Sequence, residues 1–290
     1  MADAKKDVDP VTGTETTGHE WDGIRELNTP LPRWWLGLFH LCILWAVGYW
    51  IFMPAWPGIS GYTHGLLDHS QRDDVAAQLN ALKAARHDKE RALRTASLQR
   101  IQADPDLQQF ALAEGRALFG DNCAACHGSG GQGAHGYPNL NDDVWLWGGR
   151  LEDIRHTITV GVRSTSPDTR QSQMPAFGRD AILKPEQIDD LTEYVVHLSG
   201  RAADARAERR ATRLFADNCA MCHGPSGEGD RGMGAPNLTD NEWLYGPTRA
   251  DIRDQIWNGH GGVMPTWGGR LAPEEIKALA VYVHSLGGGE

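Results

Sequence analysis

The sequence is short of positive charge and of cysteine. Its 28 lysine and arginine residues face 38 acidic residues, which leaves a formal net charge of −10 at pH 7. Nucleic-acid binding depends on basic side chains that face phosphates, so this balance argues against a nucleic-acid partner. The 5 cysteines cannot all pair, and four of them fall in two identical motifs. A disulfide scaffold is therefore excluded.

Long apolar runs are also absent, with one exception at residues 34–53. This run has 20 residues and no formal charge, which is the length that crosses a hydrocarbon core of ~30 Å. Tryptophans stand at both of its ends, as is typical of the two bilayer interfaces. A secretory signal peptide has a shorter core that is followed by small residues at a cleavage site. Here Pro54 and Pro57 follow, so we predict a retained membrane anchor over residues 34–56.

The basic residues near this run stand on its N-terminal side, and the next one along the chain is Arg72. They are Lys5, Lys6, Arg25 and Arg33. The positive-inside rule then leaves the N-terminus in the cytoplasm and the chain after residue 57 outside. Residues 1–33 are polar and lack hydrophobic periodicity, so we predict a mostly disordered cytoplasmic tail. Loosely helical spacing predicts a helical connector over residues 57–105.

The rest of the chain is a duplication. Each half carries the same features in the same order: a motif with two cysteines, a Pro-Asn-Leu step, an aromatic pair, a helical stretch, a Met-Pro step and an amphipathic end. We therefore predict a mainly α chain in which two tandem domains, residues 106–200 and 201–290, follow the anchor and connector. Each domain is expected to form from its own repeat, and the two to pack closely because almost no linker separates them.

Both repeats contain the sequence Cys-x-x-Cys-His, the signature of c-type haem attachment. The residues are Cys123, Cys126 and His127 in the first repeat and Cys219, Cys222 and His223 in the second. The two thiols bind the two vinyl groups of one haem, and the adjacent histidine is the proximal iron ligand. A Cys-x-x-Cys pair alone also suits redox or zinc chemistry. With histidine next to it, and the pattern repeated, the motif predicts two haem c groups.

The sixth iron ligand has to come from elsewhere in each repeat. Met174 lies 47 residues after His127, Met264 lies 41 residues after His223, and a proline follows each methionine. Methionine favours ferrous iron and raises the reduction potential. We expect Met174 to complete the first site and Met264 the second. Competing candidates exist: Met221, Met233, His135, His156, His197, His260 and His284.

Supporting residues follow from position in the repeats. Pro138 and Pro236 come 11 and 13 residues after the proximal histidines. A backbone carbonyl there can accept the imidazole N–H and fix the ring. The aromatic residues of each repeat are expected to form cavity walls or to donate to haem propionates, with plain core packing as the alternative. They are Trp145, Trp147, Trp243 and Tyr245.

Taken together, the anchor, the charged connector and the two haem motifs resemble the diheme subunit III of cbb3-type cytochrome c oxidases, the CcoP/FixP family. The resemblance covers the chain from about residue 20 to its end. The haem motifs occur in many cytochromes, so the order of segments is the specific part. Some family members have two transmembrane helices, whereas this sequence predicts one.

The resemblance implies two class I cytochrome c domains in the periplasm, held by a single span in a bacterial inner membrane. It also implies partners: a soluble or membrane-bound donor cytochrome c, a monohaem c subunit and the catalytic haem–copper subunit. The sequence has no histidine cluster for copper and no bis-histidine site in the anchor. The expected role is electron transfer, with oxygen chemistry left to the catalytic subunit.

Other readings stay open at this point. A free-standing membrane-anchored shuttle, or the cytochrome subunit of a periplasmic dehydrogenase, would have the same haem sites. A diheme peroxidase needs a displaceable sixth ligand, and two matched Met-Pro steps argue against it. A haem-based sensor would require the first domain to lose its methionine, which the Ser/Thr/Arg-rich residues 163–173 keep open.

Overall fold

The computed structural model describes residues 7–290, and the chain divides into two compact units that meet between Lys83 and Ala84. Part of the predicted tail, residues 1–6, lies outside the described residues. The first unit contains a hairpin and one apolar helix. The second unit contains both repeats and the end of the connector.

The hairpin pairs β1 (Thr16–Trp21) with β2 (Ile24–Leu27) in antiparallel fashion. Asp22 and Gly23 join the strands with φ values of 50° and 82°. Positive φ at both turn residues is what an Asp-Gly pair favours in a two-residue hairpin loop. The structure differs here from the disordered tail expected over residues 1–33. The Asp-Gly pair between Trp and Ile was the local signal.

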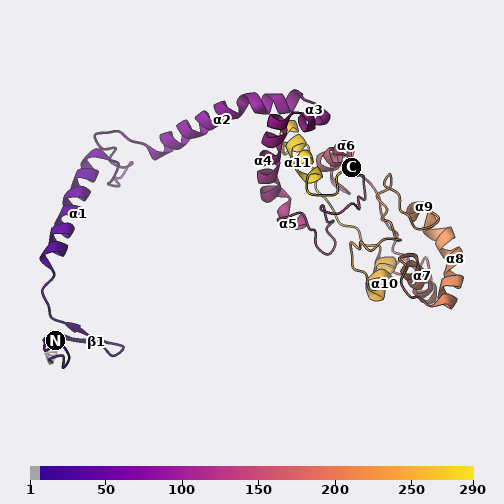
Figure 1. Ribbon diagram of the computed structural model, residues 1–290, viewed down its shortest axis with the longest axis horizontal. Helices are drawn as coiled ribbons and strands as arrows, with labels where there is room; N and C mark the ends of the chain where they lie inside the picture. The colour runs from indigo at the N-terminus through magenta and orange to yellow at the C-terminus, as the bar shows by residue number, and fades with distance from the viewer. Residues whose placement is uncertain (1–6) are drawn as a thin grey trace. The chain divides into compact units, whose positions relative to one another are not determined.

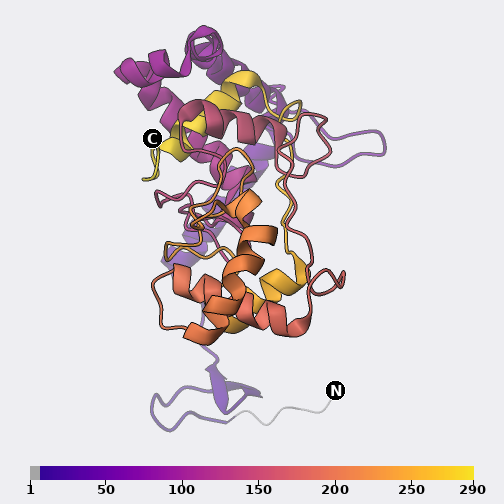
Figure 2. The same cartoon turned by 90° about the vertical axis from the view of Figure 1, so that its right-hand side faces the viewer.

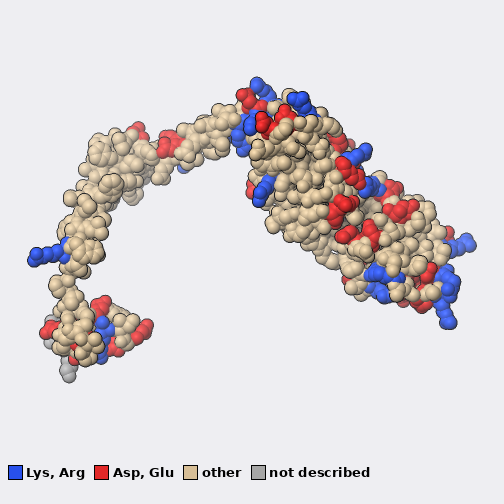
Figure 3. Space-filling model, in the orientation of Figure 1, with Lys and Arg blue, Asp and Glu red and all other residues tan. Residues whose placement is uncertain are grey.

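The apolar helix α1 spans Arg33–Phe52, 20 residues, and none of its side chains is buried within its unit. Its most apolar window has a mean hydropathy of 1.7, so its length and composition make it a candidate membrane span. A helix that shows apolar side chains on every face suits a lipid environment. Beyond Arg33 at its first position, uncharged side chains cover its surface (Figure 3). The helix ends before Pro54, which cannot continue the hydrogen-bond ladder.

The connector consists of two helices, α2 (Gln71–Thr95) and α3 (Leu98–Ala103). The end of α2 belongs to the second unit, where Leu93 and Ile101 are completely buried. Lys277 closes this end, because its Nζ donates to the carbonyls of Leu93, Arg94 and Ala96 at 3.1, 2.8 and 2.6 Å. A cation on the last carbonyls of a helix also complements the helix dipole.

The helices of the two repeats form two groups (Figure 1). The first group holds α4 (Pro105–Asn122), α5 (Ala124–His127), α6 (Leu151–Val160) and α11 (Pro273–His284). The second group holds α7 (Pro185–Leu198), α8 (Ala205–Asn218), α9 (Ala220–His223) and α10 (Arg249–Asn258). Each group therefore contains helices from both repeats.

Each group has its own apolar core. In the first, Phe119 of α4, Ile154 of α6 and Leu279 of α11 are at most 4% exposed. In the second, the matching residues are Phe215 of α8, Ile252 of α10 and Leu191 of α7. Full burial of one such side chain stabilises a fold by about 1.5–3 kcal/mol.

This arrangement differs from the expected domains at residues 106–200 and 201–290. The two repeats exchange their last helices, so α7 packs against α8 and α11 packs against α4. The short link between Leu198 and Ala205 explains part of the exchange, since it turns the chain directly from α7 into α8. Consecutive helices with short connections pack as antiparallel neighbours. The similar apolar patterns of α7 and α11 allow either helix to fill either core.

The exchanged segments meet backbone to backbone after α6 and α10. The amide of Val162 donates to the Met264 carbonyl at 3.0 Å, and the amide of Met264 donates back at 3.0 Å. On the other side, Phe177 donates to the carbonyl of Ile256 at 3.2 Å. Figure 2 shows these segments running side by side between the helical groups. Backbone bonds therefore fix the position of each Met-Pro step.

Candidate haem-binding sites

The first cavity lies beside the first cysteine motif. Cys123 and His127 line it together with Met264 from the second repeat. Most of the remaining wall is apolar, with Leu279 and Val283 contributed by α11. The cavity therefore combines one attachment motif, one imidazole and one thioether, although the thioether comes from the other repeat.

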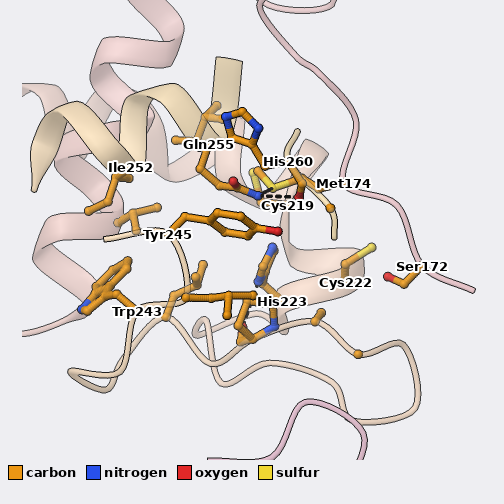
Figure 4. Close-up of a pocket in the computed structure, with 18 of the residues that line it drawn as sticks. Ser172, Met174, Cys219, Cys222, His223, Trp243, Tyr245, Ile252, Gln255 and His260 are labelled. Carbon is orange, nitrogen blue, oxygen red and sulfur yellow. Dashed lines mark hydrogen bonds between the residues drawn. The ribbon is translucent and has the colours of Figure 1, made fainter. Parts of the chain in front are cut away.

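The second cavity mirrors the first. Cys219, Cys222 and His223 line it together with Met174 from the first repeat. In Figure 4 Met174 lies on one side of this cavity and His223 on the other. The expected pairing of Met174 with the first motif and Met264 with the second thus differs from the structure. Sequence spacing could not separate these pairings, because both methionines precede proline in the same repeat context.

The spacing of each motif places its reactive groups together. Residues three and four apart share one face of a helical turn, and the turns Ala124–His127 and Ala220–His223 begin directly after the first cysteine. Within the described residues, no disulfide joins the four motif cysteines. Burial, followed by the neighbouring thiol of the motif, raises the pKa of Cys123 to about 11 and that of Cys219 to about 12.

The two histidines are fixed in the same way. Nδ1 of His127 lies 3.0 Å from the carbonyl oxygen of Pro138, and Nδ1 of His223 lies 3.0 Å from that of Pro236. A carbonyl can only accept, so the proton stands on Nδ1 and Nε2 carries the free lone pair. Burial lowers the pKa of both imidazoles, although these hydrogen bonds oppose the shift. The neutral ring is the form that binds a metal.

The competing ligand candidates are exposed, already hydrogen-bonded or outside the two cavities. Met221 is 83% exposed and Met233 37% exposed. Among the described residues, His260 is the one competing histidine that lines either cavity. Its Nε2 lies 2.6 Å from the Asp254 carboxylate, so that nitrogen is already engaged. This leaves His135, His156, His197 and His284 outside both cavity walls.

The four aromatic residues form cavity walls. Trp145 lines the first cavity, Trp243 and Tyr245 the second, and Trp147 both. The indole N–H of Trp145 donates to the carbonyl of Gly288 at 2.5 Å, so it is not free for a propionate. Trp147 packs closely on Gly234, where an added Cβ would lie 2.2 Å from the ring. The bridging position of Trp147 could not be expected without the exchange of segments.

Two glycines allow the exchanged segments to come close. Gly161 ends α6 at φ 72° and Gly259 ends α10 at φ 60°. A Cβ at either position would lie 2.4 Å from a carbonyl oxygen, that of Met264 or that of Met174 respectively. Both positions therefore require glycine for its backbone conformation and for its size.

We expect Gly259→Ala to lower the free energy of unfolding by about 1–3 kcal/mol, because it combines a strained φ with a backbone clash. The clash also displaces Met174 from the second cavity. Chemical unfolding and the far-red charge-transfer band of methionine-bound ferric haem measure the two effects. Gly269→Ala is the matched control, since Gly269 has φ 83° and open space around its Cβ position. Equal losses of stability and band intensity in both variants would contradict the role of the close approach.

The donor sets fit haem c at both sites. Each cavity offers a half-buried thiol, a neutral imidazole held through Nδ1 and a thioether, within walls that are mainly apolar. The fold and these sites define a membrane-anchored c-type cytochrome. Two regions match cytochrome c families: residues 112–199 match the family described as cytochrome c, and residues 206–283 the one described as cytochrome C oxidase, cbb3-type, subunit III. The prediction of a mainly α chain with two cytochrome c domains is confirmed.

The N-terminal region also matches, since residues 13–60 fit the family described as the N-terminal domain of cytochrome oxidase-cbb3, FixP. A FixP subunit from a Bradyrhizobium species is 55% identical over 294 residues and covers 100% of both chains. A CcoP subunit from Cereibacter sphaeroides is 50% identical over 276 residues, or 95% of each chain. This chain belongs to the FixP/CcoP family of cbb3-type cytochrome c oxidase subunits, which confirms the resemblance seen in the sequence.

Proposed function

We propose that this chain relays electrons in a cbb3-type oxidase through one haem c at each cysteine motif. The observation that carries the proposal is the make-up of the two cavities, each of which joins a motif to a methionine. Cys123 and Cys126 would attach the first haem, and Cys219 and Cys222 the second. His127 with Met264, and His223 with Met174, would be the axial ligands. Bound haem c supplies reversible one-electron chemistry at its iron.

The chain's own residues set the conditions for that chemistry. The carbonyls of Pro138 and Pro236 fix the orientation of the imidazoles and increase their basicity as ligands. The thioethers favour ferrous iron and raise the potential. The apolar walls keep water away from the ligands, and Trp147 contributes to both walls.

The proposed topology is a single pass through a bacterial inner membrane. The N-terminus lies in the cytoplasm and the haem domains lie in the periplasm. Arg25 precedes the candidate span, Arg33 is its first residue, and no lysine or arginine follows it before Arg72. The positive-inside rule supports this orientation.

The proposed partners follow from family membership. Electrons would arrive from a soluble or membrane-bound donor cytochrome c and leave through a monohaem c subunit to the catalytic haem–copper subunit. The relatives are named as subunits of the oxidase, which supports a role within that complex.

Purification from mildly solubilised membranes through a tag on this chain tests the proposal. We expect haem b bands beside the c bands, two haem c groups per chain, and cyanide-sensitive oxidation of a reduced c-type donor. Only c-type bands without co-purifying subunits would favour a free-standing shuttle or a dehydrogenase subunit instead. A change in the c-type spectrum with CO would favour the sensor reading.

A further inference from the structure

Gln255 of α10 lies beside the methionine of the second cavity. Its Nε2 is 3.5 Å from Sδ of Met174 and 3.1 Å from the carbonyl oxygen of His260. A carbonyl accepts only from a donor, so the nitrogen end of the amide must face this side. An NH₂ group has two hydrogens, one for each of these acceptors. Figure 4 shows Gln255, His260 and Met174 on the same side of the cavity.

The Gln255 amide keeps this position although one of its polar atoms has no hydrogen-bond partner within residues 7–290. Its Oε1 is buried and has no hydrogen-bond partner among the described residues. Ile252 and Ile256 lie on the same helix and also line the cavity. An apolar side chain of this shape would avoid the desolvation of the unpaired oxygen. The hydrogen bonds donated by the Gln255 amide nitrogen therefore offset the cost of burying the unpaired Oε1. Inside the cavity, the atom that accepts from this nitrogen is the sulfur of Met174.

The first cavity lacks this contact. Aligning the Asp-Ile-Arg segments of α6 and α10 places Thr157 opposite Gln255 in the repeat. The Thr157 hydroxyl donates to the carbonyl of Asp153 at 2.8 Å and accepts from Nε of Arg170 at 2.8 Å. Within residues 7–290, no hydrogen bond reaches the sulfur of Met264. The two sites share their ligand types and differ in what holds the thioether.

We propose that Gln255 is a positioning residue for Met174 and sets the second site apart from the first. Its N–H holds one lone pair of the sulfur, which leaves the other directed at the cavity. The same hydrogen bond withdraws electron density from the thioether. Because ferric iron needs that density more than ferrous iron does, the bond raises the reduction potential of the second site. The inference rests on the proposed ligation of that site by Met174.

Gln255→Leu in the full haem-loaded chain tests this. The variant places an apolar side chain of similar size at this position and removes the donor. A spectroscopic redox titration resolves two one-electron components, and a Cys219→Ser/Cys222→Ser variant shows which of them belongs to the second site. We expect that component alone to move to lower potential, by about a threefold to tenfold change in the ferric-to-ferrous ratio. A tenfold change corresponds to about 59 mV for one electron.

Two further variants keep the result specific. Arg253→Gln is the control on the same helix. Arg253 pairs with Asp189 at 2.6 Å and stacks on Trp257, and it has no contact with the sulfur of Met174 among the hydrogen bonds of the described residues. We expect it to leave both potentials unchanged, so that an equal shift there would mark a general effect of weakening α10. In a Met174→Leu background, Gln255→Leu should have no further effect, since the acceptor is gone.

The outcomes separate the inference from the proposal beneath it. If Met174→Leu moves the second component and Gln255→Leu does not, the ligation stands and the positioning role is overturned. If Gln255→Leu still shifts the potential fully in the Met174→Leu background, the residue acts by another route and the inference also fails. If Met174→Leu moves the first component instead, the proposed ligation itself is contradicted.

Discussion

Met174→Leu is expected to lower the potential of the haem proposed at Cys219 and Cys222, although Met174 belongs to the repeat that carries the other cysteine motif. Met174 lines the second cavity, opposite His223. Loss of a thioether removes a ligand that stabilises ferrous iron. The expected decrease is about 0.1–0.3 V, within the ~0.8 V range that axial ligands span.

Chains that carry one haem make this measurement unambiguous. A Cys123→Ser/Cys126→Ser variant retains the second haem alone, and Met174→Leu in that background should shift its titration and remove its methionine charge-transfer band. Met264→Leu is the matched control, because Met264 lines the first cavity. The reverse pattern, in which Met264→Leu changes the second haem and Met174→Leu does not, would show that each repeat supplies its own ligand.

Leu279→Ala is expected to lower the free energy of unfolding of the first helical group by about 2–5 kcal/mol, the usual range for a buried leucine that leaves a cavity. Leu279 is 0% exposed and lies in the core that contains Phe119. It also lines the cavity beside His127. A residue of the second repeat therefore supports the site of the first motif.

Leu191→Ala provides the reciprocal test. Leu191 is 1% exposed in α7 and lies in the core that contains Phe215, so this residue of the first repeat supports the second site. Denaturant unfolding of single-haem chains, followed at the haem absorbance, reports on each site separately. Leu279→Ala should loosen the first site and Leu191→Ala the second. If Leu279→Ala weakened the second site instead, or Leu191→Ala the first, that result would contradict the exchanged fold.

The sequence predicts much of the local structure because short-range patterns determine it. The twenty uncharged residues 34–53 predict the candidate span, and Pro54 follows the end of the helix. The Cys-x-x-Cys-His spacing places thiols and imidazole on one helical turn. The backbone carbonyls of Pro138 and Pro236 accept from the imidazoles of His127 and His223, as the spacing predicts.

The pairing of distant segments could not be predicted in the same way. The helices α7 and α11 follow similar Met-Pro steps and carry similar apolar faces. Either helix therefore satisfies the burial requirement of either core, and composition cannot decide between them. The relevant signal in the sequence was the short link of six residues between Leu198 and Ala205, because so short a link favours packing of α7 against α8.

Contacts that depend on the exchange of α7 and α11 could not be predicted either, because the sequence does not show which distant segments pair. Trp147 lines both cavities, and Gln255 reaches a sulfur 81 residues away in the sequence. Repeat alignment shows only that Gln255 stands where the first repeat has Thr157. The difference acquires a chemical meaning once Met174 is placed beside it.

The exchange of segments also makes the folding of each repeat depend on the other. A methionine from the other repeat lines each cavity, and the other repeat's last helix packs in each core. With the proposed ligands, neither site can be completed by its own repeat alone. The two haem sites of this oxidase subunit would therefore form together during folding and haem attachment.

A density map of the haem-loaded subunit within its oxidase complex tests the central claim most directly. The account predicts the sulfur of Met264 on the iron of the haem bound to Cys123 and Cys126, with the sulfur of Met174 on the other iron. Density that joins Met174 to the haem at Cys123 and Cys126 would contradict it.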